Sequence, residues 1–263
     1  MESFEFCRLA VQRIPFGETS SAKQAGENML KQLKQKVLQA NKDLVKYNLV
    51  TLTWGNVSGI DRKKNLVVIK PSGVDYSKLK TDEMVVVNLK GEVVEGKLRP
   101  SSDTPTHLEL YKNFENIGGI THSHSKYATI FAQACKEIPC YGTTQADHFY
   151  REIPVTRFLT EKEVESNYEL NTGKIIVERF KDLDPDATPG VLLAGHAAFT
   201  WGKTPEESVI NNLVLERIAQ MAYSSKQINP EIKSIPDYII KKHYLRKHGP
   251  DAYYGQAKQG KKK

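Results

Sequence analysis

The sequence predicts a single mixed α/β domain in which helices flank a central, largely antiparallel β-sheet. Its 263 residues, 39% of them hydrophobic, are enough for one full core. Short segments rich in β-branched residues follow one another along the chain, and strands that are close in sequence tend to pair in antiparallel fashion. Two Thr-x-x-Glu signatures mark helix starts among them, and no segment repeats. A mixed α/β domain therefore fits better than a repeat architecture.

The first helix is expected to begin near Met29, where hydrophobic residues recur at helical spacing as far as Val45. The preceding residues show no such periodicity. We therefore predict a poorly ordered N-terminal extension over residues 1–28, a main domain over residues 29–256 and a basic tail over residues 257–263. The methionine at the helix start suggests that the extension arises from an upstream start codon.

Six strands are predicted after this helix. Each is a short apolar or β-branched segment, and most are bounded by glycine, proline or aspartate. They cover residues 49–54, 66–69, 84–89, 92–95, 118–124 and 190–195.

The remaining helices are predicted from their capping residues. A proline in the first turn favours a helix start at Thr104, and Ser125 is a candidate N-cap. Thr160 and Thr204 each precede a glutamate by three residues, which is the capping-box pattern. The expected helices run from Thr104 through Phe114, from Ser125 through Ala134, from Thr160 to about Phe180, from Thr204 to about Tyr223, and from Pro236 to Lys247.

Composition argues against a membrane or secreted protein. No apolar run approaches the roughly 20 residues that span a bilayer, so no membrane partner is expected. The first 28 residues lack a continuous apolar segment, so no signal peptide is expected either. Cys7, Cys135 and Cys140 show neither metal nor redox spacing, which favours the reducing cytoplasm.

The net charge of +7 raises the question of a nucleic-acid partner. Four positive charges lie at the C-terminal end, on Lys258, Lys261, Lys262 and Lys263. Elsewhere acidic and basic residues alternate, and no basic stripe alternates with aromatic residues. A solvated tail is therefore favoured over a nucleic-acid-binding arm, and no nucleic-acid partner is expected. An anionic substrate explains local positive charge more simply.

Three histidines form a candidate metal site. His122 and His124 end a Gly-Gly-Ile-Thr segment, and side chains two residues apart on a strand project to the same face. His196 ends the second apolar run and can add a third nitrogen from another strand. Three imidazoles leave a coordination position open, as in catalytic metal sites. A lone buried histidine is more often a core residue, but the three together, with Asp103 as an acidic neighbour, favour metal binding.

Three short loops combine small residues with hydrogen-bond donors, over residues 54–58, 70–73 and 100–103. Such loops form concave sites that bind anions. Ser101 and Ser102 also precede a helix start, where backbone amides favour a phosphate. Each loop alone is more simply an ordinary turn, but three beside a candidate metal site favour phosphate binding. None carries a nucleotide-binding signature.

Six ordered motifs together resemble a known family. They are Trp54-Gly-Asn-Val-Ser, Ile69-Lys-Pro-Ser-Gly-Val-Asp, Pro100-Ser-Ser-Asp-Thr-Pro-Thr-His, His122-Ser-His-Ser, Lys242-His-Tyr-Leu-Arg-Lys-His-Gly and Tyr253-Tyr-Gly-Gln. The chain resembles the L-ribulose-5-phosphate 4-epimerases of the class II aldolase and adducin-type family, over about Met29 to Gln256. Each motif alone is a weak signal, whereas the ordered set is specific. The resemblance implies a class II aldolase-like fold.

The resemblance also implies the roles of individual residues. Zn²⁺, or another divalent ion, would be bound by His122, His124 and His196, with Asp103 as an acidic residue of the metal site. A phosphorylated pentulose substrate would be bound through its phosphate by Asn56, Lys70, Ser72, Gly73, Ser101 and Ser102. Asp147 and Tyr254 match the two catalytic acid/base residues. The resemblance implies a homotetramer with shared active sites, in which Tyr254 reaches a neighbouring subunit.

The activity implied is the conversion of L-ribulose 5-phosphate to D-xylulose 5-phosphate by inversion at C4, through retro-aldol cleavage and aldol re-formation. Gln145 and His148 depart from the family pattern around Asp147, and residues 194–198 depart from it around His196; these changes concern rate and positioning. The alternatives are a class II aldolase that releases dihydroxyacetone phosphate and a non-catalytic adducin-like interaction module. Either arabinose use or ascorbate-type catabolism can employ the epimerase reaction.

Overall fold

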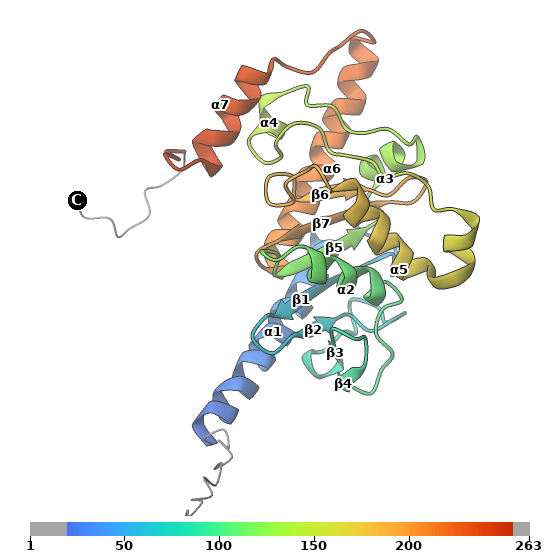
Figure 1. Cartoon of the computed structure of the whole chain (residues 1–263), viewed down its shortest axis with the longest axis vertical. Coiled ribbons are helices and arrows are strands. Elements are labelled where there is room, and N and C mark those ends of the chain that lie inside the picture. Colours follow the sequence, from blue (N-terminus) through green and yellow to red (C-terminus); the bar gives the residue numbers. More distant parts are fainter. Residues whose placement is uncertain (1–19, 255–263) are drawn as a thin grey trace, which may run out of the picture.

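Seven strands form one sheet in the order β4-β3-β2-β1-β5-β7-β6, and each neighbouring pair of these strands is antiparallel (Figure 1). The computed structural model describes the backbone of residues 20–254 and the side chains from residue 28 onward. The strands are β1 (Gly55–Asp61), β2 (Leu66–Ile69), β3 (Val85–Asn88), β4 (Val93–Glu95), β5 (Gly119–Ser123), β6 (Gly190–Leu192) and β7 (Ala198–Gly202). The prediction of a central antiparallel sheet is confirmed.

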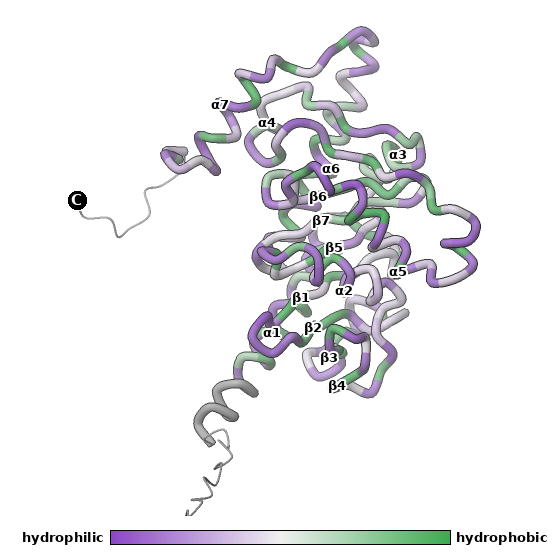
Figure 2. Tube along the Cα trace, viewed as in Figure 1, coloured by the Kyte–Doolittle hydropathy of each residue, from purple (hydrophilic) through white to green (hydrophobic). Residues whose placement is uncertain are grey.

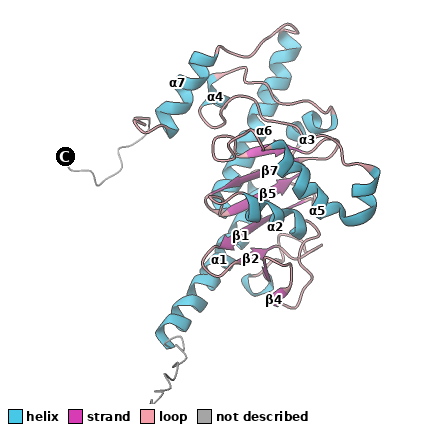
Figure 3. Ribbon diagram, viewed as in Figure 1, coloured by secondary structure: helices cyan, strands magenta, loops and turns pink. Residues whose placement is uncertain are grey.

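Helices cover both faces of this sheet (Figure 3). One face packs against α2 and α5, and the other packs against α1 and α6. The helices are α1 (Ser20–Lys46), α2 (Thr104–Asn113), α3 (Lys126–Gln133), α4 (Thr143–Ala146), α5 (Glu161–Arg179), α6 (Pro205–Ile228) and α7 (Asp237–His248), with a short 3-10 turn at Thr81–Glu83. Among these helices, none is long and apolar enough to cross a membrane.

Side-chain alternation along the strands builds the two halves of the core. In β3, Val85 and Val87 pack with α2 and α5, whereas Val86 packs with α1. The sheet is therefore hydrophobic on both faces, and its strands carry much of the hydrophobic sequence (Figure 2). Burial of these side chains, at about 25 cal/mol per Å² of apolar area, is the main stabilising contribution to the fold.

The prediction of a strand over residues 49–54 is wrong. Leu49 is buried against α1, and its amide donates to the carbonyl of Leu44, so it closes the end of that helix. Leu52 has a φ of +51°, which is incompatible with an extended strand. The strand instead begins at Gly55, where an added Cβ would lie only 2.8 Å from the carbonyl oxygen of His122. The apolar residues of this segment serve helix packing rather than strand pairing.

Other boundaries differ from the predictions by smaller amounts. The first helix begins at Ser20 rather than Met29, so the predicted boundary at residue 28 falls inside a helix. Residues 1–19 and 255–263, with Cys7 and the tail lysines, lie outside the described residues. Helix α6 continues to Ile228, and neither α4 nor β7 was predicted. Local capping signals locate helix starts better than helix ends, because ends depend on what the last turns pack against.

Ser125 occupies the predicted N-cap position of α3, but its side chain forms no capping hydrogen bond. Thr160 and Thr204 do cap their helices, each accepting from the amide of the glutamate three residues later. Helix α5 is kinked at Asn167, whose φ and ψ are not helical. This kink directly precedes Tyr168, whose hydroxyl group approaches His196 in the turn between β6 and β7.

Candidate functional site

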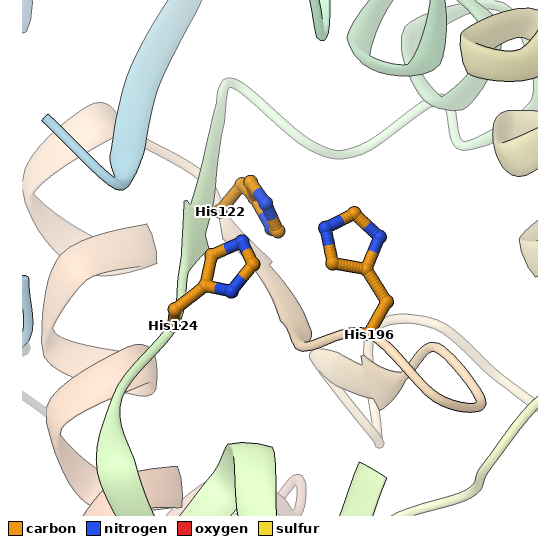
Figure 4. A group of neighbouring side chains, drawn as sticks. All are labelled: His122, His124 and His196. Atoms are coloured by element: carbon orange, nitrogen blue, oxygen red, sulfur yellow. The ribbon is translucent and has the colours of Figure 1, made fainter. Parts of the chain in front are cut away.

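Three imidazoles converge where β5 ends and the chain turns from β6 to β7. His122 lies on β5 and His124 directly after it, while His196 lies in the turn (Figure 4). Their ligand nitrogen atoms all lie within 4.8 Å of one another. Because β5 is paired on both edges, with Asn56 opposite one side of His122 and Phe199 opposite the other, the strand is held rigidly in the middle of the sheet. The sequence prediction that the three histidines come together is confirmed.

A hydrogen bond to a backbone carbonyl determines which nitrogen of His122 is free, and a second contact lies at His196. The Nδ1 atom of His122 lies 3.0 Å from the carbonyl oxygen of Ala198, which can only accept, so Nδ1 carries the proton and Nε2 is left with its lone pair. The Nδ1 atom of His196 lies 3.5 Å from the hydroxyl oxygen of Tyr168. Outer partners of this kind orient the imidazoles of metal sites.

The imidazoles are neutral at physiological pH. Burial lowers the pKa of His122 and of His124, and it lowers the pKa of His196 to about 4, with the neighbouring His122 adding to the effect. A neutral imidazole has the free lone pair that a metal ion requires. The three histidines are therefore in the protonation state that metal binding requires.

Asp103 lies at the N-cap position of α2, beside the histidines. Burial alone would raise the pKa of its carboxyl, but His122, His107 and a 2.6 Å hydrogen bond from the side-chain amide of Asn56 lower it more. Asp103 is therefore ionised at neutral pH. It does not belong to the set of ligand atoms that lie within 4.8 Å of one another, so the structure places it next to the histidine triad rather than in it.

A single cavity of about 580 Å³ joins these groups to the polar loops. Every residue predicted to bind metal or phosphate lines it: Asn56, Lys70, Ser72, Gly73, Ser101, Ser102, Asp103, His122, His124 and His196. Two of the loops are bonded to each other, since the amide of Ser101 donates to the carbonyl of Lys70 and the amide of Ser72 donates to that of Arg99. Loops far apart in the sequence thus form one wall of the cavity.

Lys70 is the most unusual residue of this wall. Its side chain is 2% exposed, its Nζ donates to the carbonyl of Pro71 at 3.3 Å and lies 4.9 Å from the ring centre of Tyr76. It takes part in none of the ion pairs formed by residues 28–254. Burial lowers the pKa of Lys70 to about 8. A buried cation without a carboxylate partner is costly, and an anionic ligand in the cavity would offset that cost.

Other residues that line the cavity also favour an anionic ligand. Ser101 and Ser102 precede α2, whose first amides point toward the N-terminal end of the helix. Gly73 has a φ of +69°, and an added Cβ would meet no atom within 4 Å, so the backbone here borders open space. The Oδ1 atom of Asn56 is buried and has no hydrogen-bond partner among the described residues. Such an atom is available to a hydroxyl group of a ligand.

Asp147 and Tyr254 do not line this cavity in their own chain. Asp147 ends α4, and its carboxylate accepts from the Nε and Nη2 atoms of Arg246 at 3.0 and 2.7 Å and lies 3.1 Å from Nδ1 of His243. The guanidinium of Arg246 lies 4.6 Å from the ring centre of Tyr254. The two predicted acid/base residues are therefore joined to each other through Arg246, at the α4–α7 end of the molecule (Figure 1).

The charge state of Asp147 follows from these contacts. Burial would raise its pKa, but the hydrogen bonds from Arg246 and His243 lower it more, so the carboxyl is ionised at neutral pH. Gln145 and His148, the two departures from the family pattern, lie nearby and make different contacts. The side-chain amide of Gln145 donates to the carbonyls of Ile138 and Arg151 and so holds a loop, while His148 lies 3.5 Å from Nζ of Lys247.

Two residues near the triad were missed from the sequence. Tyr168 is brought to His196 by the kink in α5, which no sequence signal indicated. His107 is fully buried behind the site, with Nδ1 2.7 Å from the hydroxyl of Ser58, and burial lowers its pKa to about 3. Its position in the Pro-Ser-Ser-Asp-Thr-Pro-Thr-His motif was a signal, but the motif does not say that the side chain points inward.

Comparison with known proteins gives a consistent result. Residues 35–223 match the model of the class II aldolase and adducin N-terminal domain. The chain is 54% identical over 227 residues to the L-ribulose-5-phosphate 4-epimerase UlaF of Salmonella paratyphi B, an alignment that covers 86% of this chain and 100% of that protein. An L-fuculose 1-phosphate aldolase of known structure shares 28% identity and superposes with a TM-score of 0.70 over 82% of this chain and 95% of the other. The L-fuculose 1-phosphate aldolase from Glaciozyma antarctica PI12, at 17% identity and a TM-score of 0.68 over 91% and 88% of the two chains, shows the same fold.

Proposed function

Because this chain belongs to the class II aldolase and adducin family, we propose that it is a metal-dependent L-ribulose-5-phosphate 4-epimerase that forms D-xylulose 5-phosphate. One observation carries the proposal beyond the family: a single cavity contains both a triad of neutral imidazoles and a buried lysine that has no carboxylate partner among the described residues. The first suits a metal ion and the second suits a phosphate. A phosphorylated sugar with a carbonyl group can engage both.

The donor set fits Zn²⁺. Three imidazole nitrogens with an open position form a common catalytic zinc site, and other divalent ions accept the same ligands. His122, His124 and His196 would hold the ion, with the ionised Asp103 next to them. When bound, such an ion supplies Lewis-acid polarisation of the substrate carbonyl.

The polar loops that line the cavity would bind the phosphate. Lys70 contributes a positive charge, and Ser72, Ser101 and Ser102 contribute hydroxyl groups and backbone amides. Anchoring the phosphate holds the C5 end of the substrate while the C4 end changes configuration, which keeps the cleaved fragment in place. The Oδ1 atom of Asn56, which has no partner among the described residues, would accept from a sugar hydroxyl.

The reaction needs two proton carriers. The C4 hydrogen is not adjacent to the carbonyl and is not usefully acidic, so inversion would proceed by breaking and re-forming the C3–C4 bond. A base takes the C4 hydroxyl proton, and an acid returns a proton to the C4 oxygen after the new aldehyde presents its other face. Asp147 and Tyr254 are the candidates, since Asp147 is an ionised carboxylate and a tyrosine is a good donor to an alkoxide.

The proposal includes a homotetramer with shared active sites. Neither Asp147 nor Tyr254 lines the cavity of its own chain, and Tyr254 is 57% exposed on the described surface. Both can therefore serve the cavity of a neighbouring subunit. We place the enzyme in the cytoplasm on the basis of its cysteine pattern.

Product identification by NMR tests the proposal. Incubation with L-ribulose 5-phosphate should form D-xylulose 5-phosphate, and a chelator should abolish the conversion. Release of free aldehyde without the epimer would instead support the class II aldolase. A protein that binds no divalent ion and neither epimerises nor cleaves L-ribulose 5-phosphate would support the adducin-like interaction module.

A further inference from the structure

The back of the histidine strand is bonded to α6 through polar side chains. Alternation along β5 directs His122 toward the cavity and its two neighbours, Thr121 and Ser123, toward α6. The hydroxyl of Thr121 lies 2.8 Å from that of Ser208, and the hydroxyl of Ser123 donates to Oδ1 of Asn212 at 2.7 Å. All four of these side chains are buried. They fix the position of β5 along the helix.

One turn further along the same face of α6 is Glu216, which is 8% exposed. Its carboxylate accepts from the backbone amides of Tyr127 and Ala128, each at 3.0 Å. These are the second and third residues of α3, so Glu216 caps that helix in place of Ser125. A carboxylate is also favoured at this position by the helix dipole. Glu216 forms no ion pair with the described part of the chain, so these amides are its polar partners.

Helix α3 connects two of the three histidines. It begins two residues after His124, and near its other end the carbonyl of Ala132 accepts from the amide of Gly195 at 2.8 Å. Gly195 directly precedes His196. A shift of α3 would therefore move His124 and His196 relative to each other, while His122, held within β5, stays in place.

We infer that Glu216 is a positioning residue for the metal site: by clamping the start of α3, it sets the separation of His124 and His196. This inference rests on the proposed metal site. Glu216 does not line the cavity, so its effect on the site is transmitted through α3 and not through contact with a ligand.

Metal affinity tests this role without using turnover. In Glu216→Gln an oxygen at the Oε2 position can still accept from both amides, but the side-chain NH₂ group at the Oε1 position then faces the amide of Tyr127, donor against donor, so α3 should shift. The dissociation constant for Co²⁺, measured by chelator competition well below the unfolding temperature, should rise on the order of 10-fold or more. The visible absorption of bound Co²⁺ should change in shape, because the ligand geometry changes. Glu216→Asp, which keeps the charge on a shorter side chain, should give an intermediate value.

Val209→Ala is the matched control. Val209 lies on the same helix and is 1% exposed, but it packs with α1 rather than with α3. It should lower the unfolding temperature and leave the Co²⁺ affinity and spectrum unchanged. If Glu216→Gln and Glu216→Asp lower the unfolding temperature yet bind Co²⁺ with wild-type affinity and spectrum, Glu216 is only a stabilising cap and the inference is wrong. A wild-type protein that binds no Co²⁺ would overturn both this inference and the metal proposal, whereas one that binds Co²⁺ without epimerising the substrate would overturn the proposed function alone.

Discussion

The two groups of predicted site residues lie in very different surroundings. The residues predicted to bind metal and phosphate surround the end of β5, a central strand whose five residues are all buried. Asp147 and Tyr254 belong to the α4–α7 region, where Ile240 is the buried residue of α7 and packs in a small cluster, while Asp147 and Tyr254 themselves make ionic and cation–π contacts. Packing against the sheet therefore fixes the binding groups, while the proposed proton carriers depend on a peripheral helix. A peripheral helix is well suited to reach a neighbouring subunit, whereas a buried strand is not.

The largest effect should come from the buried side of this comparison. His124→Ala removes one ligand from a half-buried position, and it should release the metal and reduce turnover on the order of 10³-fold, because a bound ion contributes several kcal/mol to the transition state. Metal analysis and steady-state rates measure both. Full activity with a normal metal content would remove His124 from the site.

On the peripheral side, Tyr254→Phe should cut turnover by roughly 10²-fold, the lower end of the usual contribution of an acid/base group. Its metal content should be unchanged, because the candidate ligand set consists of three histidines and does not include Tyr254. Inductively coupled plasma analysis alongside product assays would separate the two effects. Wild-type turnover would exclude Tyr254 from the mechanism.

Mixing the two variants sharpens the comparison. If sites are shared, hybrid assemblies of His124→Ala and Tyr254→Phe subunits contain some sites in which both residues are intact. Co-refolded mixtures should therefore be more active than the sum of the separate variants. No recovery, in mixtures shown by native mass spectrometry to contain hybrids, would mean that each chain supplies its own complete site.

A smaller effect is expected at Lys70, which binds without taking part in proton transfer. Its pKa of about 8 means that it is charged below that pH and loses its charge above it. Since the charged form binds phosphate, kcat/KM should fall as the pH rises through about 8 in the free enzyme. Lys70→Met should raise KM more than it lowers kcat and should remove this alkaline limb. A limb that persists in Lys70→Met would assign the titration to another group.

The same lowered pKa has a consequence for stability. In the unfolded chain the lysine keeps its ordinary pKa of 10.5, so between about pH 8 and 10.5 the unfolded state binds more protons than the folded state. The contribution of Lys70 to the free energy of unfolding should therefore rise with pH in this window. Denaturation of wild type and Lys70→Met at pH 7.5 and 9.5 would reveal the difference, and equal pH dependence in the two proteins would contradict it.

The smallest effect should come from removing residues 1–28. Among the described side chains of α1, the first that packs against the core is Leu30, so the described core contacts begin after this segment. Activity and unfolding temperature should stay within error of the full chain. A loss of either would show that the segment is part of the folded domain.

Much of the candidate site could be predicted from the sequence because its signals are local. The spacing of His122 and His124 and the glycine and serine loops depend on neighbouring residues, and the structure brings them together in one cavity. The capping threonines are equally local, and both form their predicted caps. Ligand chemistry is also local, since an imidazole carries its donor atom wherever the chain places it. The sequence alone was therefore enough to predict a metal and phosphate site.

Only the tertiary structure determined the features that depend on contacts between distant segments of the chain. It assigned the apolar residues 49–54 to helix packing, kinked α5 so that Tyr168 meets His196, and gave the cap of α3 to Glu216 instead of Ser125. It also placed Asp147 and Tyr254 together and away from their own cavity. These outcomes depend on which surfaces pack together, because a hydrogen bond or a buried side chain finds its partner in three dimensions rather than at a fixed spacing in the sequence.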